Sequence, residues 1–287
     1  MKQVAIVTDS TACLPTDLIA AYDIQVVPIS LIFEGRVFRD GVDISASEFY
    51  ELLARSEKLP TTSPCPPGSY LEVFRNLGER FKSVLCITVA RRLSGMFDSA
   101  IAAKETARDV GLDATLEVMD SGTAAMAQGF VVLAAARAAE AGKSLAEVVK
   151  SAQDISSKVN LVAVLDTLNY LAKGGRISKA AAWASSLLQI KPILQLSRGE
   201  VSLLTRARTK TRAVKRVLAI MKQRVTQGQK PHVAVFHANV PQEAQSLKEQ
   251  LASQLDCAEL YITQFTPVMG AHSGPGVLGV AFYSDDR

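Results

Sequence analysis

The sequence predicts an α/β protein with two α/β domains, the first built on a mainly parallel sheet and the second on a mixed or antiparallel sheet. Apolar runs of strand length alternate with longer patterns of helical period, which is typical of α/β architecture. The 287 residues are enough for one large or two medium domains. The short turn Arg198-Gly199-Glu200 between two apolar runs predicts a hairpin, which makes the second sheet at least partly antiparallel.

The first half of the chain is expected to form an open parallel sheet with helices on both sides. The segment VLCITV (84–89) is apolar on both faces, as a parallel strand covered by helices should be. The expected strands are residues 4–9, 24–33, 83–90 and 115–120. The expected helices are residues 16–22, 45–56, 67–81, 94–110 and 122–141.

A helix from about Lys143 is expected to lead into the second half, with the domain boundary near residue 155, so that the domains span 1–155 and 156–287. In LNYLAKGGRIS, a helix should end at Gly174 in a left-handed cap, so that Lys173 and Arg176 project from a tight corner. The expected strands are 161–166, 191–196, 201–207, 232–238, 259–265 and 277–283. The expected helices are 178–188, 211–226 and 241–254.

Composition indicates a folded protein with a large core. The chain is 48% hydrophobic and 21% charged, and its net charge of +4 does not indicate a nucleic-acid or membrane partner. The four cysteines show no C-x-x-C spacing and no nearby histidine, which predicts reduced thiols and no metal site. Asp9 interrupts the first apolar run, so that run is not expected to be a signal peptide. The segment GFVVLAAARAAEA is too short and too charged to span a bilayer. We therefore expect a cytoplasmic protein without stable membrane insertion.

Four turns of the first half are rich in hydroxyl groups: Thr8–Thr11, Pro60–Pro64, Arg91–Gly95 and Asp120–Thr123. Three of them leave the carboxyl end of an expected strand and enter a helix, where open parallel sheets bind ligands. Ser94 is placed as an N-cap beside free backbone N–H groups, an arrangement that suits an anion. Helix capping explains any one of these turns alone, but the four together predict a small anionic or polar ligand.

The last apolar segment is preceded by AHSGPGVLG, which spells G-x-G-x-x-G at Gly274, Gly276 and Gly279. A dinucleotide fingerprint follows a strand and opens a helix, whereas this one runs into a final strand, so we reject that interpretation. His272 lies in this glycine-rich loop. Two interpretations stay open for it: a donor delivered from the second domain to an anion held by the first, or an imidazole satisfied by loop backbone.

The segment TRARTKTRAVKR (205–216) holds six basic residues and no acidic one. It has no aromatic residues for base stacking and no helix-turn-helix pattern. A solvated face or a docking surface for an acidic partner is favoured, and DNA binding is the weakest alternative.

Several motifs, in this order along the chain, resemble the DegV family: VAIVTDSTACLP, TTSPCP, SGMFDSA, MDSGTAAMAQG, LNYLAKGGRIS and AHSGPGVLGVAFY. The resemblance covers residues 3–285. It implies that a long-chain, palmitate-like fatty acid is bound between the two domains, with no other cofactor. It also implies a non-catalytic carrier that presents the carboxylate to an ATP-binding kinase subunit, which forms an acyl phosphate for phospholipid synthesis in bacteria.

The resemblance places the carboxylate-binding residues at Thr62, Ser94 and His272. Arg176, with Lys173, falls where the family's cationic residues face the kinase or the transferred phosphate. The loop reads Thr-Ser-Pro instead of Thr-Ser-Gln-Pro and the turn Ser-Gly-Met instead of Ser-Gly-Thr, so an amide and a hydroxyl of the family pattern are missing. From the same turns, the predicted fatty-acid-binding set also includes Ser63, Gly95 and Ser121.

The alternative function is a stand-alone hydrolase or acyltransferase that uses Ser94 as nucleophile and His272 as base. The sequence has no G-x-S-x-G elbow and no clear third residue to orient the histidine. The carrier hypothesis is therefore preferred.

Overall fold

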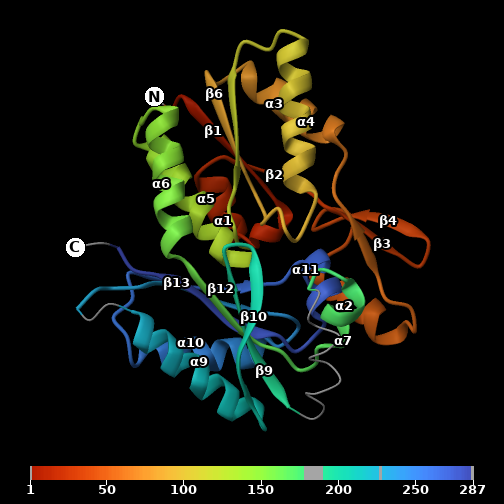
Figure 1. The fold of residues 1–287 in the computed structure, drawn as a ribbon, viewed down its shortest axis with the longest axis vertical. Coiled ribbons are helices and arrows are strands. Elements are labelled where there is room, and N and C mark those ends of the chain that lie inside the picture. Colours follow the sequence, from red (N-terminus) through yellow and green to blue (C-terminus); the bar gives the residue numbers. More distant parts are fainter. Residues whose placement is uncertain (1, 178–189, 226–227, 286–287) are drawn as a thin grey trace.

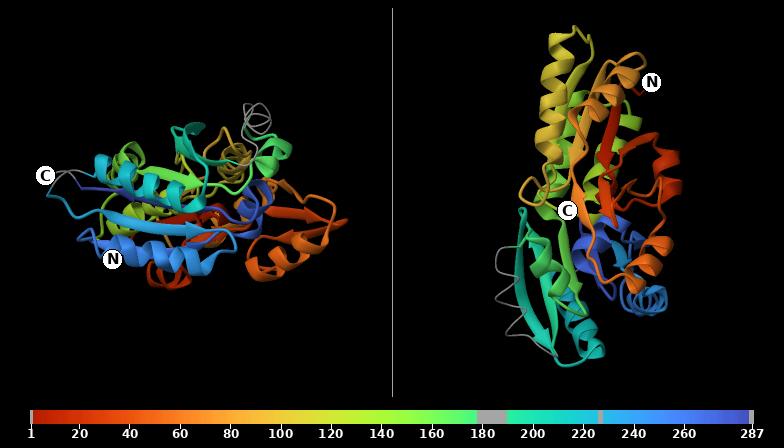
Figure 2. Two further views of the ribbon diagram at one scale, coloured as in Figure 1. Left: turned by 90° about the horizontal axis from the view of Figure 1, so that it is seen from below. Right: turned by 90° about the vertical axis from the view of Figure 1, so that its right-hand side faces the viewer.

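The computed structural model describes residues 2–177, 190–225 and 228–285. Two main sheets lie one above the other along the long axis, with the first half of the chain above and the second half below (Figure 1). The right-hand view of Figure 2 shows the same stacking from the side.

The strands are β1 (Val4–Asp9), β2 (Ile24–Val27), β3 (Ser30–Phe33), β4 (Arg36–Arg39), β5 (Thr61–Ser63), β6 (Ser83–Thr88), β7 (Thr115–Asp120), β8 (Asn160–Val164), β9 (Lys191–Ser197), β10 (Glu200–Ala207), β11 (His232–His237), β12 (Glu259–Gln264) and β13 (Leu278–Tyr283). The helices are the 3-10 helix η1 (Ser10–Ala12), α1 (Thr16–Ala21), α2 (Ala46–Arg55), α3 (Pro67–Gly78), α4 (Met96–Asp109), α5 (Ala125–Glu140), α6 (Leu145–Lys158), α7 (Asn169–Gly174), α9 (Lys210–Arg224), α10 (Pro241–Ala252) and α11 (Pro267–Ser273).

The first main sheet has the order β2-β1-β6-β7, and every neighbouring pair is parallel. Every residue of β1 is buried, and so is all of β6 after Ser83, because helices cover both faces. Helices α3 and α4 lie on one side of this sheet and α5 and α6 on the other (Figure 1). The predicted parallel sheet is confirmed.

The second main sheet has the order β10-β9-β8-β13-β11-β12 and is mixed, with a single parallel pair, β11 and β12, among the described strands. Alternate residues of each strand point to opposite faces. Val162 and Val164 pack with α9 and α10 in an outer apolar cluster, whereas Ala163 and Leu165 belong to the core shared with the first half. The hairpin predicted at Arg198-Gly199 joins β9 to β10.

The prediction of a single strand over residues 24–33 is wrong, because two strands, β2 and β3, form there. Pro28 has no N–H to give to a ladder, and the chain leaves the parallel sheet there. The segment after it, β3, pairs with β4 and β5 in a separate antiparallel sheet of order β4-β3-β5, which carries Thr62. The helix expected at 178–188 lies outside the described residues.

Two local predictions about the site are also wrong. Helix α4 begins at Met96 with Gly95 as its N-cap, and within the described chain no side chain caps it, so Ser94 is not a cap. A Cβ on Gly95 would lie 3.3 Å from the Pro64 ring, which explains why a glycine occupies that position. His272 lies in the last turn of α11 and not in a loop; Gly270 within this short helix weakens its sequence signal, although Pro267 at the first helical position is a start signal.

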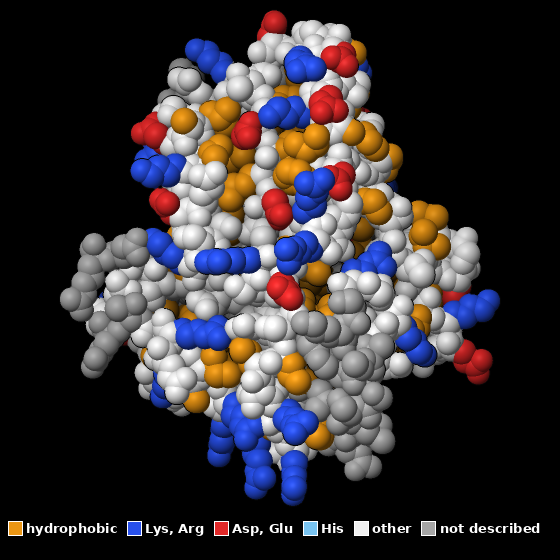
Figure 3. Space-filling view, in the orientation of Figure 1, with side chains coloured by type: hydrophobic (Ala, Val, Ile, Leu, Met, Phe, Trp, Pro, Cys, Tyr) orange, Lys and Arg blue, Asp and Glu red, His pale blue; other side chains and the backbone are white. Residues whose placement is uncertain are grey.

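Lysine and arginine side chains gather at the lower end of the face shown in Figure 3, below the second sheet. The 205–216 segment, at the end of β10 and the start of α9, lies at this lower end in Figure 1. A shallow hollow is lined by Arg206, Arg208, Arg212, Lys215 and Arg216. No described helix is both long enough and apolar enough to cross a bilayer.

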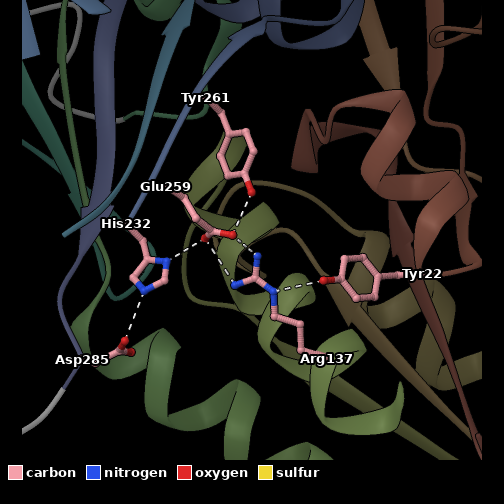
Figure 4. A network of polar contacts seen from close by, with 6 residues as sticks. All are labelled: Tyr22, Arg137, His232, Glu259, Tyr261 and Asp285. Atoms are coloured by element: carbon pink, nitrogen blue, oxygen red, sulfur yellow. Dashed lines mark hydrogen bonds and ion pairs between the residues drawn. The ribbon is translucent and has the colours of Figure 1, made fainter. Parts of the chain in front are cut away.

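A polar network joins the two halves at the amino ends of β11 and β12 (Figure 4). Glu259 accepts a two-pronged hydrogen bond from the Arg137 guanidinium of α5 and further bonds from Tyr261 Oη at 2.8 Å and His232 Nδ1 at 2.6 Å. Although burial raises the pKa of Glu259, these bonds hold it at about 2. His232 has a carboxylate at each ring nitrogen, Glu259 and Asp285, and these bonds raise its pKa against the effect of burial.

Candidate ligand cavity and its polar end

A cavity of about 160 Å³ lies between the two main sheets. One water needs roughly 10–15 Å³ of such space, so the cavity has room for a ligand. Apolar side chains make up most of its wall. They are Ile29, Val89, Leu93, Ala124, Leu161, Ala163, Leu165, Leu171, Ile177, Leu194, Leu196, Val201, Phe236, Phe265, Val268, Met269 and Val277. Thr11, Thr62, Ser94, Arg176, Gln195, His272 and Ser273 complete the lining.

The cavity runs along β8. Leu161, Ala163 and Leu165 all line it, and Leu161 pairs with Leu196 at one end of the β8–β9 ladder. At ~3.3 Å per strand residue, the four steps from Leu161 to Leu165 span about 13 Å. Because α7 follows β8 and packs against α11, the polar residues of these helices lie at the carboxyl end of the strand. The cavity is therefore elongated, with a polar end near α7 and α11 and a mainly apolar end, which includes Gln195, near Leu161 and Leu196.

Three side chains from distant parts of the chain meet at the polar end. His272 Nε2 lies 2.8 Å from Thr62 Oγ1, and Arg176 Nη2 donates to the same oxygen at 3.3 Å. Arg176 Nη1 also donates to the Gly174 carbonyl at 2.7 Å, which holds the guanidinium at the mouth. The structure thus brings together Thr62, His272 and Arg176, three of the residues predicted for the site.

The hydrogen-bond pattern assigns the protons in this cluster. His272 Nδ1 is buried and has no hydrogen-bond partner among the described residues, and an unpaired acceptor there costs less than an unpaired N–H. We therefore infer that the proton is on Nε2, which donates to Thr62. Since Thr62 Oγ1 then accepts from both His272 and Arg176, its own hydroxyl hydrogen is free to donate to a ligand.

His272 is neutral at physiological pH. Burial, and secondly the charge of Arg176, lower its pKa from 6.5 to about 4. The unfolded chain binds this proton more readily than the folded chain does. Protonation of His272 therefore lowers the stability of the fold below about pH 6.5, and increasingly so toward pH 4.

The glycines around His272 permit close packing. A Cβ on Gly174 would lie 2.9 Å from His272 Nδ1, so α7 approaches the imidazole directly. Gly274 and Gly276 have φ angles of +74° and +88°, and a Cβ on them would lie 2.2 Å from the Tyr170 ring and 2.1 Å from the Asp166 carboxylate, respectively. The GPG motif therefore serves the turn from α11 into β13.

The remaining predicted residues lie around the cavity. Ser94 lines it, and its hydroxyl makes no hydrogen bond to any other described residue. The Ser94-Gly95 turn packs on Pro64 of the Thr62 loop.

Three further predicted residues lie outside the lining. Ser63 donates to the Pro64 carbonyl, and the buried Ser121 donates to the Thr123 carbonyl. Lys173 is exposed on the last turn of α7. Gly175, not Gly174, adopts the left-handed cap there, with φ at +70°.

Sequence reasoning missed the floor of the cavity. Asp9 is fully buried and accepts the N–H groups of Thr11 at 3.1 Å and Val89 at 2.7 Å, and both of these residues line the cavity. Burial raises the pKa of the Asp9 carboxyl. The sequence does carry a signal for it, because Thr8–Thr11 is a hydroxyl-rich turn at the end of a strand.

The geometry does not favour the hydrolase alternative. Among the described residues, His272 has Thr62 as its hydrogen-bond partner instead of Ser94, and its free nitrogen has no carboxylate to orient it. A pKa of about 4 makes it a weak base at neutral pH. No described group of three or more His, Cys, Asp or Glu side chains is placed to hold a metal ion.

The model of the family described as "Uncharacterised protein, DegV family" matches residues 3–285. The chain belongs to the DegV family. A DegV domain-containing protein of Caldanaerobacter subterraneus is 34% identical over 98% of this chain and 99% of its own length. Protein DegV of Bacillus subtilis is 31% identical over 97% of this DegV-family chain and 98% of its own.

Solved structures of DegV-family proteins have the same two-domain fold. A DegV-family protein from Thermus thermophilus, described as binding fatty acid, gives a TM-score of 0.91 at 29% identity, over 99% of this chain and 100% of that one. The fatty-acid-binding DegV of Bacillus subtilis gives 0.89 at 30%, with the same coverage. A stearic-acid-binding protein from Eubacterium ventriosum gives 0.90 at 28%, over 99% and 98%. The predicted family and fold class are confirmed.

Proposed function

We propose that this DegV-family chain binds one long-chain fatty acid in the cavity between its sheets and presents the carboxylate to a partner kinase. The observation that carries the proposal is an elongated, mainly apolar cavity in which Thr62, His272 and Arg176 meet at one end. The fatty acids bound by the Thermus, Bacillus and Eubacterium relatives support it.

The tail of the ligand provides the affinity. A palmitate-sized chain offers about 14 methylenes, and at ~0.8 kcal/mol each their burial supplies roughly 11 kcal/mol before the costs of binding. The apolar wall from Leu165 to Leu161 and Leu196 would receive this chain. At the apolar end, the described lining contains no cation that would attract a carboxylate. The head group therefore faces the polar end.

The head group contacts Thr62 and Ser94, and His272 acts through the Thr62 hydroxyl to which it donates. Thr62 has a hydroxyl hydrogen free to donate, and Ser94 has a hydroxyl without a partner in the described structure. Neutral donors of this kind leave the carboxylate more reactive toward phosphoryl transfer than a bidentate arginine clamp would. Ser63, Gly95 and Ser121 act through the conformation of their three turns and not by direct contact.

Presentation to a kinase would use the mouth of the cavity. Arg176 lines the cavity and is exposed, and Lys173 is exposed three residues earlier. Both could contact the partner or the transferred phosphate. When the loaded protein, ATP and the partner kinase are combined, hydroxylamine should trap an acyl hydroxamate, and Arg176→Ala should reduce its yield. If the loaded protein forms the hydroxamate with ATP alone, the carrier role is wrong.

The double variant Thr62→Val, Ser94→Ala should bind fatty acid at least about 100-fold more weakly, because hydrogen bonds to a charged group contribute ~1.5–3 kcal/mol each and two of them are lost. Displacement of a fluorescent fatty acid measures this change. Thr61→Val is the matched control, since Thr61 is an exposed neighbour on β5 outside the cavity lining. Equal affinities for the double variant and the control would show that neither hydroxyl contacts the fatty acid.

A further inference from the structure

The amino end of α11 is capped by a residue from the other half of the chain. Its own N-cap residue, Thr266, makes no capping bond with its side chain in the described structure. The N–H of Val268 instead donates to Asp40 Oδ1 at 3.0 Å, across 228 residues of sequence. An acceptor oxygen at this position satisfies a free N–H of the first turn.

Asp40 is itself held in place. It follows β4 directly, its side chain is buried with 2% of the residue exposed, and its own N–H donates to the Ile29 carbonyl at 2.9 Å. Ile29 lines the cavity. The Asp40 carboxyl is therefore held in a buried, ordered position and is not a mobile surface group.

Helix α11 links the cap at Asp40 to His272 at the polar end of the cavity. His272 lies four residues after Val268, one turn along the same face of the helix. A helix of seven residues has little stability of its own, so its first turn depends on the cap and on packing. On the packing side, Gly270 lies against Tyr50 and Phe49 of α2, where a Cβ would be 2.6 Å from Tyr50 Oη.

We propose that Asp40 is a positioning residue for His272: by accepting the Val268 N–H it fixes the first turn of α11, and with it the imidazole that bonds Thr62. This inference rests on the proposed function, because the position of His272 matters to a ligand only if the carboxylate binds there. The role needs an acceptor oxygen and not a charge, and an asparagine side chain supplies the same oxygen.

Nuclear magnetic resonance of the imidazole nitrogens tests the role directly, since the chain has three histidines and His272→Ala assigns the signal. In the native protein the His272 ring should titrate near pH 4. In Asp40→Ala, α11 loosens, and the ring should titrate nearer the ordinary value of about 6.5. Fatty-acid affinity should fall roughly tenfold, as expected for the loss of one cap. Asp40→Asn should match the native protein in both measurements.

Asp43→Ala is the control, because Asp43 lies in the same loop but is bonded to Arg39 at the surface, at 2.7 Å. If the alanine variant does not fold, Asp40→Ser makes the same comparison, since its shorter side chain cannot reach Val268. A native titration of His272 in Asp40→Ala or Asp40→Ser would overturn the proposal, as would an asparagine variant that behaves like alanine. Failure of the native protein to bind fatty acid would instead refute the proposed function, with the titration unaffected.

Discussion

Replacing Glu259 with leucine should lower the free energy of unfolding by about 2–3 kcal/mol, less than for one partner of a fully buried ion pair because this pair is only partly buried. Arg137 would be left with Tyr22 as its remaining hydrogen-bond partner among the described residues, and its side chain is 32% exposed. His232 would lose the acceptor at Nδ1. The network joins α5 to β11 and β12, so the two halves should also separate more readily. Urea denaturation followed by circular dichroism measures the change.

Two comparisons make this result specific. The double variant Arg137→Met, Glu259→Leu should recover much of the loss, because an apolar pair leaves no uncompensated charge. Asp256→Ala, which breaks the exposed pair with Lys230, should cost at most about 1 kcal/mol. A Glu259→Leu variant as stable as Asp256→Ala would show that the network does not hold the two halves together.

Ala163→Phe should abolish tight fatty-acid binding while leaving the fold intact. Ala163 lies on β8 midway along the cavity wall, so a phenyl ring would occupy the space of the acyl chain. If about five methylenes are excluded, at ~0.8 kcal/mol each, affinity falls by roughly 1000-fold. The variant should keep its stability, because the ring fills existing space and overpacks no neighbour.

Ala141→Phe is the control for the larger side chain, since Ala141 is exposed at the end of α5. It should bind as the native protein does. An Ala163→Phe variant that is folded and binds with native affinity would place the acyl chain elsewhere in the molecule.

The sequence predicted the layers of the fold better than the details of its site. Strands such as β6 were predictable because buried parallel strands are apolar on both faces, and the β9–β10 hairpin because its turn is short. The small sheet carrying Thr62 was missed because the apolar run at 24–33 is continuous apart from Pro28. Helix α11 was missed because Gly270 interrupts its pattern, and that glycine is required by contact with Tyr50, a residue far away in sequence.

Tertiary contacts explain the rest of the difference. Nothing near His272 in the sequence indicates that Gly174 packs against its ring or that Asp40 caps its helix. The hydroxyl-rich turns did indicate the correct edge of the first sheet, because the carboxyl ends of parallel strands share one edge. Thr11 and Ser94 from two of these turns line the cavity, whereas Ser121 from a third lies outside the lining and braces its own turn.

The most direct test of the central claim is denaturing solvent extraction of the purified native protein, with Ala163→Phe beside it, followed by mass spectrometry of the lipids. We predict one long-chain fatty acid per chain from the native protein and almost none from the variant. A native protein that releases no fatty acid and also takes up none when fatty acids are added would contradict the account.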